Sequence, residues 1–158
     1  MKTILVPVDF SRVTDAVVQE ASSLARALPA RVVLLTVIQP PVIMSEYGAL
    51  LGDVVQITAA GEKNAARQLA RLKEKLADTS VKTDTVQLNG LPIRLIVEQA
   101  KKLEADYIVM GSHGHTALYD LLVGSTTHGV LMRAACPVVI VPSPTMAKSR
   151  KTAKSKAA

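Results

Sequence analysis

The chain has few aromatic residues, a single cysteine and no tryptophan. One Phe and three Tyr stand among its 158 residues, whereas 49% of the residues are apolar, with many Val, Ile, Leu and Ala. This composition is typical of a domain whose strands are buried on both faces of a parallel sheet. The single Cys136 excludes a disulfide within the chain and favours a reducing compartment. No base or metal ligand adjoins it in sequence, so we expect a packed thiol rather than a nucleophile.

Long apolar runs are also missing from the sequence. The first run, from Thr3 to Val8, is interrupted by Pro7 and stops at Asp9, which is too early for the apolar region of a signal peptide. No stretch approaches the roughly 18 uninterrupted apolar residues of a membrane span. We therefore expect a soluble, cytoplasmic protein without a membrane partner.

Acidic residues are absent from the last eleven positions, which carry five basic residues. Without those five, 14 basic side chains face 13 acidic ones, so the net charge of +6 belongs mostly to a tail. We divide the chain into a domain, residues 1–143, and a basic tail, residues 144–158, which we expect to be disordered. Such a tail can bind acidic surfaces weakly through phosphate contacts, but the near-neutral domain argues against nucleic acid as the main partner. The five residues are Lys148, Arg150, Lys151, Lys154 and Lys156.

Strand-like and helix-like patterns alternate along the domain. Apolar runs predict strands over residues 3–8, 32–38, 81–88, 107–110 and 138–141, of which 81–88 has the alternation of an edge strand. Helical spacing predicts helices between Ser11 and Pro29, over residues 59–77, from Pro92 to Leu103 and over residues 125–135, with Ser11 capping the first. The irregular stretch 39–56 is long enough for a lid or contact loop. The alternation predicts an α/β fold with a doubly wound parallel sheet, in which ligands bind at the carboxyl ends of strands.

Two glycine-containing segments near the fourth predicted strand have the character of a phosphate site. Met-Gly-Ser-His-Gly occupies residues 110–114 at the end of that strand, and Gly-Ser-Thr occupies residues 124–126, where a helix is predicted to begin. Glycine lets the chain turn sharply and brings main-chain N–H groups close to a ligand. The first N–H groups of a helix favour anions. If the sheet reverses between the first and fourth strands, Asp9 faces these two segments across one crevice.

Other interpretations of these residues remain open from the sequence. Asp9 can instead stabilise the turn before the first helix. The three histidines, His113, His115 and His128, have no Cys or carboxylate at the usual ligand spacing, so we do not predict a zinc site. A Gly-x4-Gly-Lys-Ser/Thr loop is missing, and no set of nucleophile, base and orienting residue stands out. The residues therefore favour nucleotide binding over catalysis.

Three motifs together resemble the universal stress protein family. They are the opening segment 4–11, Ile-Leu-Val-Pro-Val-Asp-Phe-Ser, the spacing Gly111-x2-Gly114-x9-Gly124-Ser125, and the closing segment 136–142, Cys-Pro-Val-Val-Ile-Val-Pro. Their order and spacing extend the resemblance over about residues 2–142. The resemblance implies a single-domain five-stranded parallel sheet of order 3-2-1-4-5 with helices on both faces. It also implies a homodimer and, through the glycine motif, ATP binding.

The resemblance places a nucleotide site on particular residues of this chain. It implies that Asp9 and the main chain around Val37 border the adenosine, while the two glycine segments form the phosphate site. Asp9 is suited to accept a hydrogen bond from a ribose hydroxyl or to bind Mg²⁺ that is coordinated by the phosphates. The hydroxyls of Ser125 and Thr126 can donate to phosphate oxygens. The implied nucleotide-contacting residues are Pro7, Val8, Asp9, Val37, Met110, Gly111, His113, Gly114, Gly124, Ser125 and Thr126.

One position departs from the family pattern. Many relatives have Arg or Lys directly after the second glycine, where this chain has His115. Because a neutral imidazole brings less charge to a triphosphate, we expect weaker and more pH-dependent binding of ATP.

We interpret the chain as an ATP-binding universal stress protein, a nucleotide-dependent regulatory module for an unknown downstream protein in the stress response. The alternative is a slow ATPase or an autophosphorylating enzyme that uses the same site. A third hypothesis, a dimeric scaffold without nucleotide, is disfavoured by the intact glycines. The last predicted strand, residues 138–141, is apolar and lies at the end of the sheet, so two copies are expected to pair there as a symmetric dimer.

Overall fold

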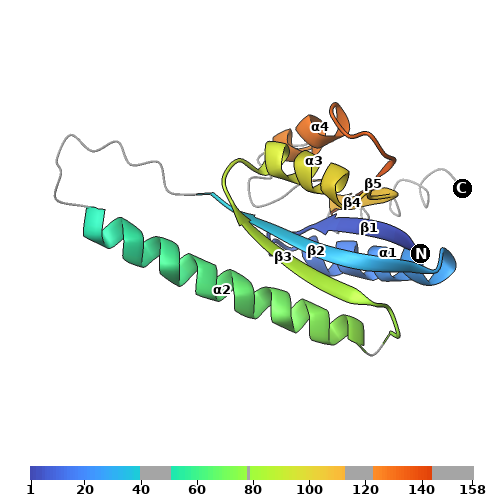
Figure 1. Cartoon of the computed structure of the whole chain (residues 1–158), viewed down its shortest axis with the longest axis horizontal. Coiled ribbons are helices and arrows are strands. Elements are labelled where there is room, and N and C mark those ends of the chain that lie inside the picture. Colours follow the sequence, from blue (N-terminus) through green and yellow to red (C-terminus); the bar gives the residue numbers. More distant parts are fainter. Residues whose placement is uncertain (40–50, 78, 113–122, 144–158) are drawn as a thin grey trace, which may run out of the picture.

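Strands and helices alternate along the whole domain, as the sequence predicts (Figure 1). The computed structural model describes residues 1–39, 51–77, 79–112 and 123–143, and only the backbone of residues 51–55. The predicted basic tail, residues 144–158, lies outside these residues. The elements are β1 (Lys2–Pro7), α1 (Thr14–Ala27), β2 (Ala30–Ile38), α2 (Leu51–Ala77), β3 (Thr83–Asn89), α3 (Pro92–Lys102), β4 (Tyr107–Gly111), α4 (Ser125–Leu131) and β5 (Val138–Val141).

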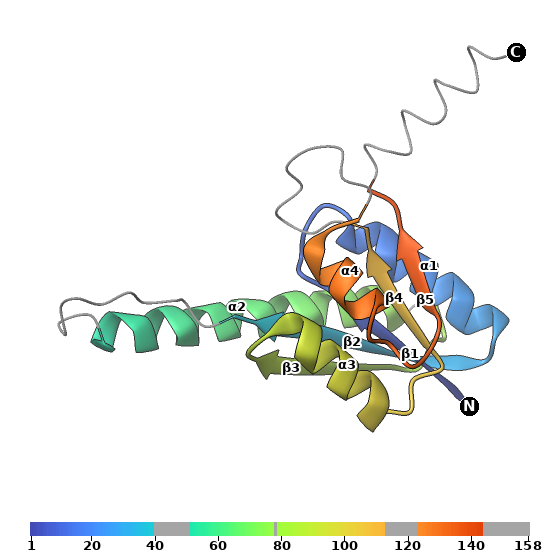
Figure 2. The same cartoon turned by 90° about the horizontal axis from the view of Figure 1, so that it is seen from above.

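The five strands form one parallel sheet in the order β3-β2-β1-β4-β5. Leu5 of β1 is paired with Val33 of β2 on one side and with Ile108 of β4 on the other. β3 lies at one edge, which confirms the prediction of an edge strand, and β5 lies at the opposite edge. The chain moves outward from β1 to β2 and β3, and then returns to the other side of β1 to form β4 and β5 (Figure 2). The direction of winding therefore reverses between β1 and β4.

Two apolar cores cover the two faces of this sheet. Ile4 and Val6 of β1 are fully buried on the face covered by α1 and α2, whereas Leu5 between them is fully buried on the face covered by α3 and α4. Figure 1 shows the two pairs of helices on opposite sides of the strands. Successive side chains of a strand point to opposite faces, so a strand buried on both faces must be continuously apolar. This explains the aliphatic runs that mark the strands in the sequence.

The start of α1 corrects the prediction that Ser11 caps this helix. The N-cap residue is Val13, and the main-chain oxygen of Ser11 accepts the Thr14 N–H at 3.0 Å. Among the described residues, the buried Ser11 Oγ has no hydrogen-bond partner. The physical reason is the preceding turn, because the Ser11 N–H donates to Asp9 Oδ1 at 3.0 Å and the helix begins only after this turn.

Two further helix boundaries differ from the predictions. α2 begins at Leu51, so residues 51–56 are helical rather than part of an irregular loop, while residues 40–50 lie outside the described residues. Gln56 and Ile57, the first residues of α2 whose side chains are described, are exposed, so these two positions do not form part of a buried stripe that would indicate a helix. α4 ends at Leu131 rather than Ala135. Within the described ranges, no helix is both long and apolar enough to cross a membrane.

Candidate functional site

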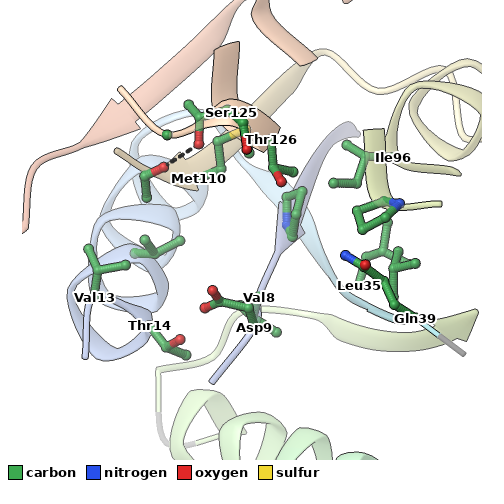
Figure 3. Close-up of a pocket in the computed structure, with 17 residues that line it drawn as sticks. Val8, Asp9, Val13, Thr14, Leu35, Gln39, Ile96, Met110, Ser125 and Thr126 are labelled. Carbon is green, nitrogen blue, oxygen red and sulfur yellow. Dashed lines mark hydrogen bonds between the residues drawn. The ribbon is translucent and has the colours of Figure 1, made fainter. Parts of the chain in front are cut away.

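A pocket of about 360 Å³ opens where β1, β2 and β4 end (Figure 3). It lies at the point where the winding of the sheet reverses, which is where doubly wound sheets bind their ligands. Residues from the first turns of α1, α3 and α4 complete its walls. The lining residues are Pro7, Val8, Asp9, Val13, Thr14, Val17, Leu35, Val37, Gln39, Pro92, Ile96, Met110, Gly111, Gly124, Ser125, Thr126 and Thr127.

The turn after β1 brings a carboxylate to this pocket. The Val8 N–H donates to Leu35 O at 2.8 Å, which extends the pairing of β1 with β2 by one residue beyond Pro7. Asp9 follows directly, and its Oδ1 accepts the Ser11 N–H at 3.0 Å. Phe10 between them has a φ of 61°, in the left-handed region that a bulky residue rarely adopts. The predicted turn-stabilising role of Asp9 is therefore present, and because a carboxylate accepts several hydrogen bonds at once, it is compatible with a ligand contact.

The opposite wall is held together by hydrogen bonds between β4 and α4. The buried Thr127 donates from Oγ1 to Gly111 O at 2.7 Å, drawn as the dashed line in Figure 3. The Gly124 N–H donates to Ser112 O at 2.6 Å. These two bonds fix the first turn of α4 against the end of β4. The hydroxyls of Ser125 and Thr126 therefore come to the pocket at a set position.

Ser112 links this wall to the end of β5. Its N–H donates to Val141 O at 2.8 Å, and its Oγ accepts the Ser143 N–H at 3.2 Å. Together with the Gly124 contact, these bonds join β4, α4 and β5 at one buried residue. The rim of the pocket is thus tied to the edge of the sheet.

Nine of the eleven predicted site residues line this one pocket. They are Pro7, Val8, Asp9, Val37, Met110, Gly111, Gly124, Ser125 and Thr126. The other two, His113 and Gly114, lie outside the described residues, as does His115. The structure thus brings the end of the first strand and the two glycine segments together, although they are about a hundred residues apart in sequence.

The sequence analysis missed eight residues of the pocket. Most come from helices that face the carboxyl edge of the sheet, where only the three-dimensional arrangement shows which turn is near. In a doubly wound sheet the helices begin near the carboxyl ends of the strands, so Thr14 and Pro92, the first residues of α1 and α3, could have been predicted from this rule. The missed residues are Val13, Thr14, Val17, Leu35, Gln39, Pro92, Ile96 and Thr127.

The chemistry of the pocket is divided between two kinds of surface. Leu35, Val37, Pro92 and Ile96 form an apolar wall, whereas the end of β4 and the start of α4 contribute glycine main chain and hydroxyls. Of the described lining residues, Asp9 is the one that carries a charge. Among the described residues, no three His, Cys, Asp or Glu side chains gather as a metal site. The arrangement suits a ligand with an apolar ring at one end and anionic oxygens at the other.

The comparison with known proteins adds the family. The sequence matches the description "Universal stress protein family" over residues 1–142. The chain belongs to the universal stress protein family. The universal stress protein MJ0531 of Methanocaldococcus jannaschii is 32% identical to it over 145 residues, which cover 90% of this chain and 83% of that relative. The structure of universal stress protein UspA from Lactobacillus plantarum is 30% identical, with a TM-score of 0.81 and coverage of 89% of this chain and 97% of that one.

A more distant universal stress protein structure contains a nucleotide. It comes from Archaeoglobus fulgidus and is in complex with dAMP. Its identity is 20%, its TM-score is 0.63, and the match covers 89% of this chain and 97% of that one. The likeness shows that the two proteins share the universal stress protein fold.

Cys136 of this universal stress protein lies away from the pocket. Its side chain packs against the core beneath α3 and α4, which confirms the prediction of a packed thiol. Burial, and to a smaller extent the negative charge of Asp106, raises the pKa of the Cys136 thiol. Since the thiolate is the reactive form, these surroundings suppress nucleophilic chemistry at this position.

Proposed function

We propose that this universal stress protein binds ATP in the pocket at the ends of β1, β2 and β4 and acts as a nucleotide-dependent regulatory module. The observation that carries the proposal is that Asp9 and the glycine segments around Gly111 and Gly124 line one pocket at the reversal of the sheet. A doubly wound sheet offers its ligand site at this position. The pocket volume of about 360 Å³ falls within the range of small-molecule sites, roughly 300–1,000 Å³.

The lining residues fit the parts of a nucleotide. The apolar wall of Leu35, Val37 and Ile96 suits the flat faces of a base, and Asp9 suits a ribose hydroxyl. The hydroxyls of Ser125 and Thr126 can donate to phosphate oxygens, as charge-assisted hydrogen bonds do. Mg²⁺ is commonly bound by one or two carboxylates together with the phosphates, which the single carboxylate of Asp9 allows. ATP with Mg²⁺ is therefore the ligand for which the described residues supply matching groups.

Comparison with relatives supports an adenine nucleotide. The Archaeoglobus fulgidus protein of the same fold is a dAMP complex, so this fold can accommodate an adenine base and a phosphate. The longer phosphate chain of ATP is a proposal that rests on the glycine segments and hydroxyls of this chain. The intact glycines also argue against a scaffold that has lost its nucleotide.

The lining favours binding over hydrolysis. Within the described part of the lining, Asp9 is the sole ionisable side chain, and no Lys, His or Cys accompanies it. Efficient phosphoryl transfer relies on several positioned charges around the phosphates. We infer that ATP is retained, that its presence changes contacts with a downstream protein during stress, and that the protein works in the cytoplasm.

We also propose that two copies pair through β5 to form a symmetric dimer. β5 is at the edge of the sheet and consists of Val138, Val139, Ile140 and Val141, of which the first three are half-buried in the single chain. An apolar strand at an open edge invites pairing with another strand. A second copy that offers the same edge closes the assembly with twofold symmetry.

The binding proposal is tested by calorimetric titration of the Asp9→Ala variant with ATP and Mg²⁺. Loss of a hydrogen bond to a charged group costs about 1.5–3 kcal/mol, so we expect Kd to rise about 10- to 100-fold. Asp15→Ala is the matched control, because Asp15 is an exposed acid on α1 that pairs with Lys75 at 2.9 Å and does not line the pocket. Equal affinity of the two variants would contradict the role of Asp9. Failure of the unaltered protein to bind ATP would overturn the proposed function.

A further inference from the structure

The pocket offers hydroxyl groups to phosphates, but its charge does not match theirs. Asp9 is the one charged side chain among the described lining residues, and its charge is negative. The hydroxyls of Ser125 and Thr126 can donate hydrogen bonds, but they are neutral. Arg12 and Arg94 stand close to lining residues in sequence, yet both are exposed and neither lines the pocket. Within the described lining, a triphosphate therefore meets no cationic side chain.

The last described residue lies beside the phosphate end of the pocket. The Ser143 N–H donates to Ser112 Oγ at 3.2 Å, and the Gly124 N–H donates to Ser112 O at 2.6 Å. Gly124 and Ser125 both line the pocket. Ser143 is therefore two hydrogen bonds away from the glycine segment that the proposed function assigns to the phosphates. The chain beyond Ser143 starts at this point, at the carboxyl edge of the sheet.

The chain that continues from this point is the basic tail, residues 144–158, which contains no acid. Lys148, Arg150 and Lys151 stand within its first eight positions, and two further lysines follow. An extended chain spans at most about 3.3–3.6 Å per residue, so the five residues that end at Lys148 can span about 17 Å. The tail is thus long enough to bring its first cations to the neighbouring glycine segment. The match to the family covers residues 1–142 and does not include the tail.

We propose that the basic tail supplies the positive charges that neutralise the phosphates of the bound nucleotide. Lys148, Arg150 and Lys151 form ion pairs with the phosphate oxygens, to which Ser125 and Thr126 donate hydrogen bonds. Arginine and lysine are the usual cationic partners of phosphate. More phosphates give more partners to the tail, so the tail favours ATP over ADP and ADP over AMP. This inference rests on the proposed ATP site.

Charge and position favour the nucleotide over a nucleic acid as the occupant of the tail. Without the five basic residues of the tail, 14 basic side chains face 13 acidic ones, so the domain adds almost no net positive charge to a contact with a long polyanion. The phosphate site, in contrast, lies next to the residue from which the tail starts. A nucleic acid partner is therefore kept as an outcome of the test.

The test measures the affinity of AMP, ADP and ATP, each with Mg²⁺, for three full-length proteins by calorimetric titration. One is the unaltered chain, and the second is the tail variant, Lys148→Gln, Arg150→Gln and Lys151→Gln. The third is a control that removes the same charge from exposed lysines outside the pocket, which form no ion pair with a described residue: Lys82→Gln, Lys101→Gln and Lys102→Gln.

The tail variant is expected to lose affinity in proportion to the number of phosphates. Exposed ion pairs each change affinity about 1.4- to 5-fold, so three of them change it on the order of tenfold. We expect the Kd for ATP to rise by this factor in the tail variant, the Kd for ADP to rise less, and the Kd for AMP to change least. The control is expected to bind all three nucleotides as the unaltered chain does.

Chemical labelling tests the contact itself. With ATP and Mg²⁺ bound, Lys148 and Lys151 are expected to react more slowly with an acetylating ester than with adenosine bound, because an ion-paired amine is shielded. Lys101 is the internal control and should react equally in both states. Mass spectrometry of the peptides reports the extent of acetylation at each lysine. Equal labelling of Lys148 and Lys151 in the two states would contradict the contact.

The outcomes separate this inference from the proposed function. If the unaltered chain binds ATP and the tail variant keeps the same ratio of ATP to AMP affinity, the inference about the tail is wrong and the ATP site stands. The same holds if the tail variant loses affinity for a short DNA duplex but not for ATP, since the tail then serves nucleic acid. An equal loss of ATP affinity in the control would show an effect of net charge alone and would also overturn the inference. If the unaltered chain binds no nucleotide, both proposals fail together.

Discussion

Asp9 is held in a turn whose backbone is strained. The next residue, Phe10, has a left-handed φ of 61°, and the Ser11 N–H donates back to the Asp9 carboxylate. A bulky residue in this region costs on the order of 1–3 kcal/mol and persists where the surrounding structure demands it. Phe10 packs against the core beneath α1 and α2, and this packing helps to hold its backbone in the left-handed conformation. The turn therefore sets the direction of the one charged side chain among the described residues of the pocket.

Gly129 is the residue at which α4 comes close to α3. A Cβ atom there would lie 2.5 Å from Ile93 Cδ1, 3.0 Å from Cγ1 and 3.2 Å from Cγ2. Gly129→Ala is therefore expected to lower the free energy of unfolding, by about 1–3 kcal/mol if it behaves as overpacking generally does. Gly61→Ala is the control, because Gly61 is an exposed helical glycine of α2 with no atom within 4 Å of the added Cβ. That change should stabilise the protein by about 0.5–1 kcal/mol. Denaturant unfolding measures both, and stabilisation by both variants would contradict the close packing.

The Cys136 thiol is predicted to react slowly at neutral pH. Burial and the negative charge of Asp106 raise its pKa, so the thiolate fraction at pH 7 is smaller than that of an ordinary thiol. As the pH is raised, the rate of its alkylation by iodoacetamide should therefore increase at a higher pH in the folded chain than in the unfolded chain. Asp106→Asn removes the charge and keeps an oxygen that can accept the Thr3 N–H, so it should lower the pKa and speed alkylation. A folded protein that reacts as fast as the unfolded chain at pH 7 would refute this account.

At the scale of elements, the backbone of β5 divides its hydrogen bonds between two sides. The carbonyl of Pro137 accepts the N–H of Ile108 in β4, and the carbonyl of Val141 accepts the N–H of Ser112, the residue after β4. Since the direction of backbone groups alternates along a strand, those of Val138 and Ile140 point to the open edge. A dimer that pairs through β5 needs these outward groups.

Ile140→Pro is expected to convert the proposed dimer to a monomer without unfolding the chain. Proline removes the outward N–H of Ile140 and leaves the pairing with β4 intact, as proline is tolerated at strand edges that face solvent. Ile140→Ala keeps the N–H and shortens the side chain, so it should leave more dimer than the proline variant. Sedimentation velocity reports the mass of each, and circular dichroism confirms folding. A folded proline variant that remains dimeric would show that the interface lies elsewhere.

The sequence predicted every element of the described fold, but not all of the boundaries. Strands were found because burial on both faces makes them continuously apolar, as in residues 3–8. The start of α2 was missed because Gln56 and Ile57 contact little of the core and leave no periodic pattern. Ser11 was assigned as a cap from its position alone, whereas the bond from its N–H to Asp9 depends on the folded turn. The strand order came from the resemblance, because nothing local in a strand specifies its neighbour.

The candidate site was predicted in part, because some of its residues have a recognisable sequence pattern and others do not. Asp9 and Gly111 could be recognised because an acid and a glycine follow apolar strand patterns, and Gly124 could be recognised because it stands where a helix is predicted to begin. Apolar residues such as Val13 and Ile96 serve the core and the pocket at once, so their pattern predicts only a buried face. Gln39 has no motif around it, and only its position at the end of β2 places it at the pocket.

At the scale of the whole molecule, the pocket joins the two layers of helices. α1 lines it from one face of the sheet, and α3 and α4 line it from the other. A ligand that contacts both layers binds the folded chain and not the unfolded one, so it raises stability with concentration. The link from Gly124 through Ser112 to Val141 connects the same pocket to the β5 edge. The proposed nucleotide site and the proposed dimer edge therefore meet in one structural unit.

The most direct test of the central claim is native mass spectrometry of the protein incubated with ATP and Mg²⁺, sampled over time. The account predicts that each chain gains the mass of a bound ATP and that this mass persists through the incubation. Conversion of the bound ATP to ADP that stops in Asp9→Ala would instead support the enzyme. If no nucleotide is bound at any ATP concentration, the claim that this pocket is an ATP site is contradicted.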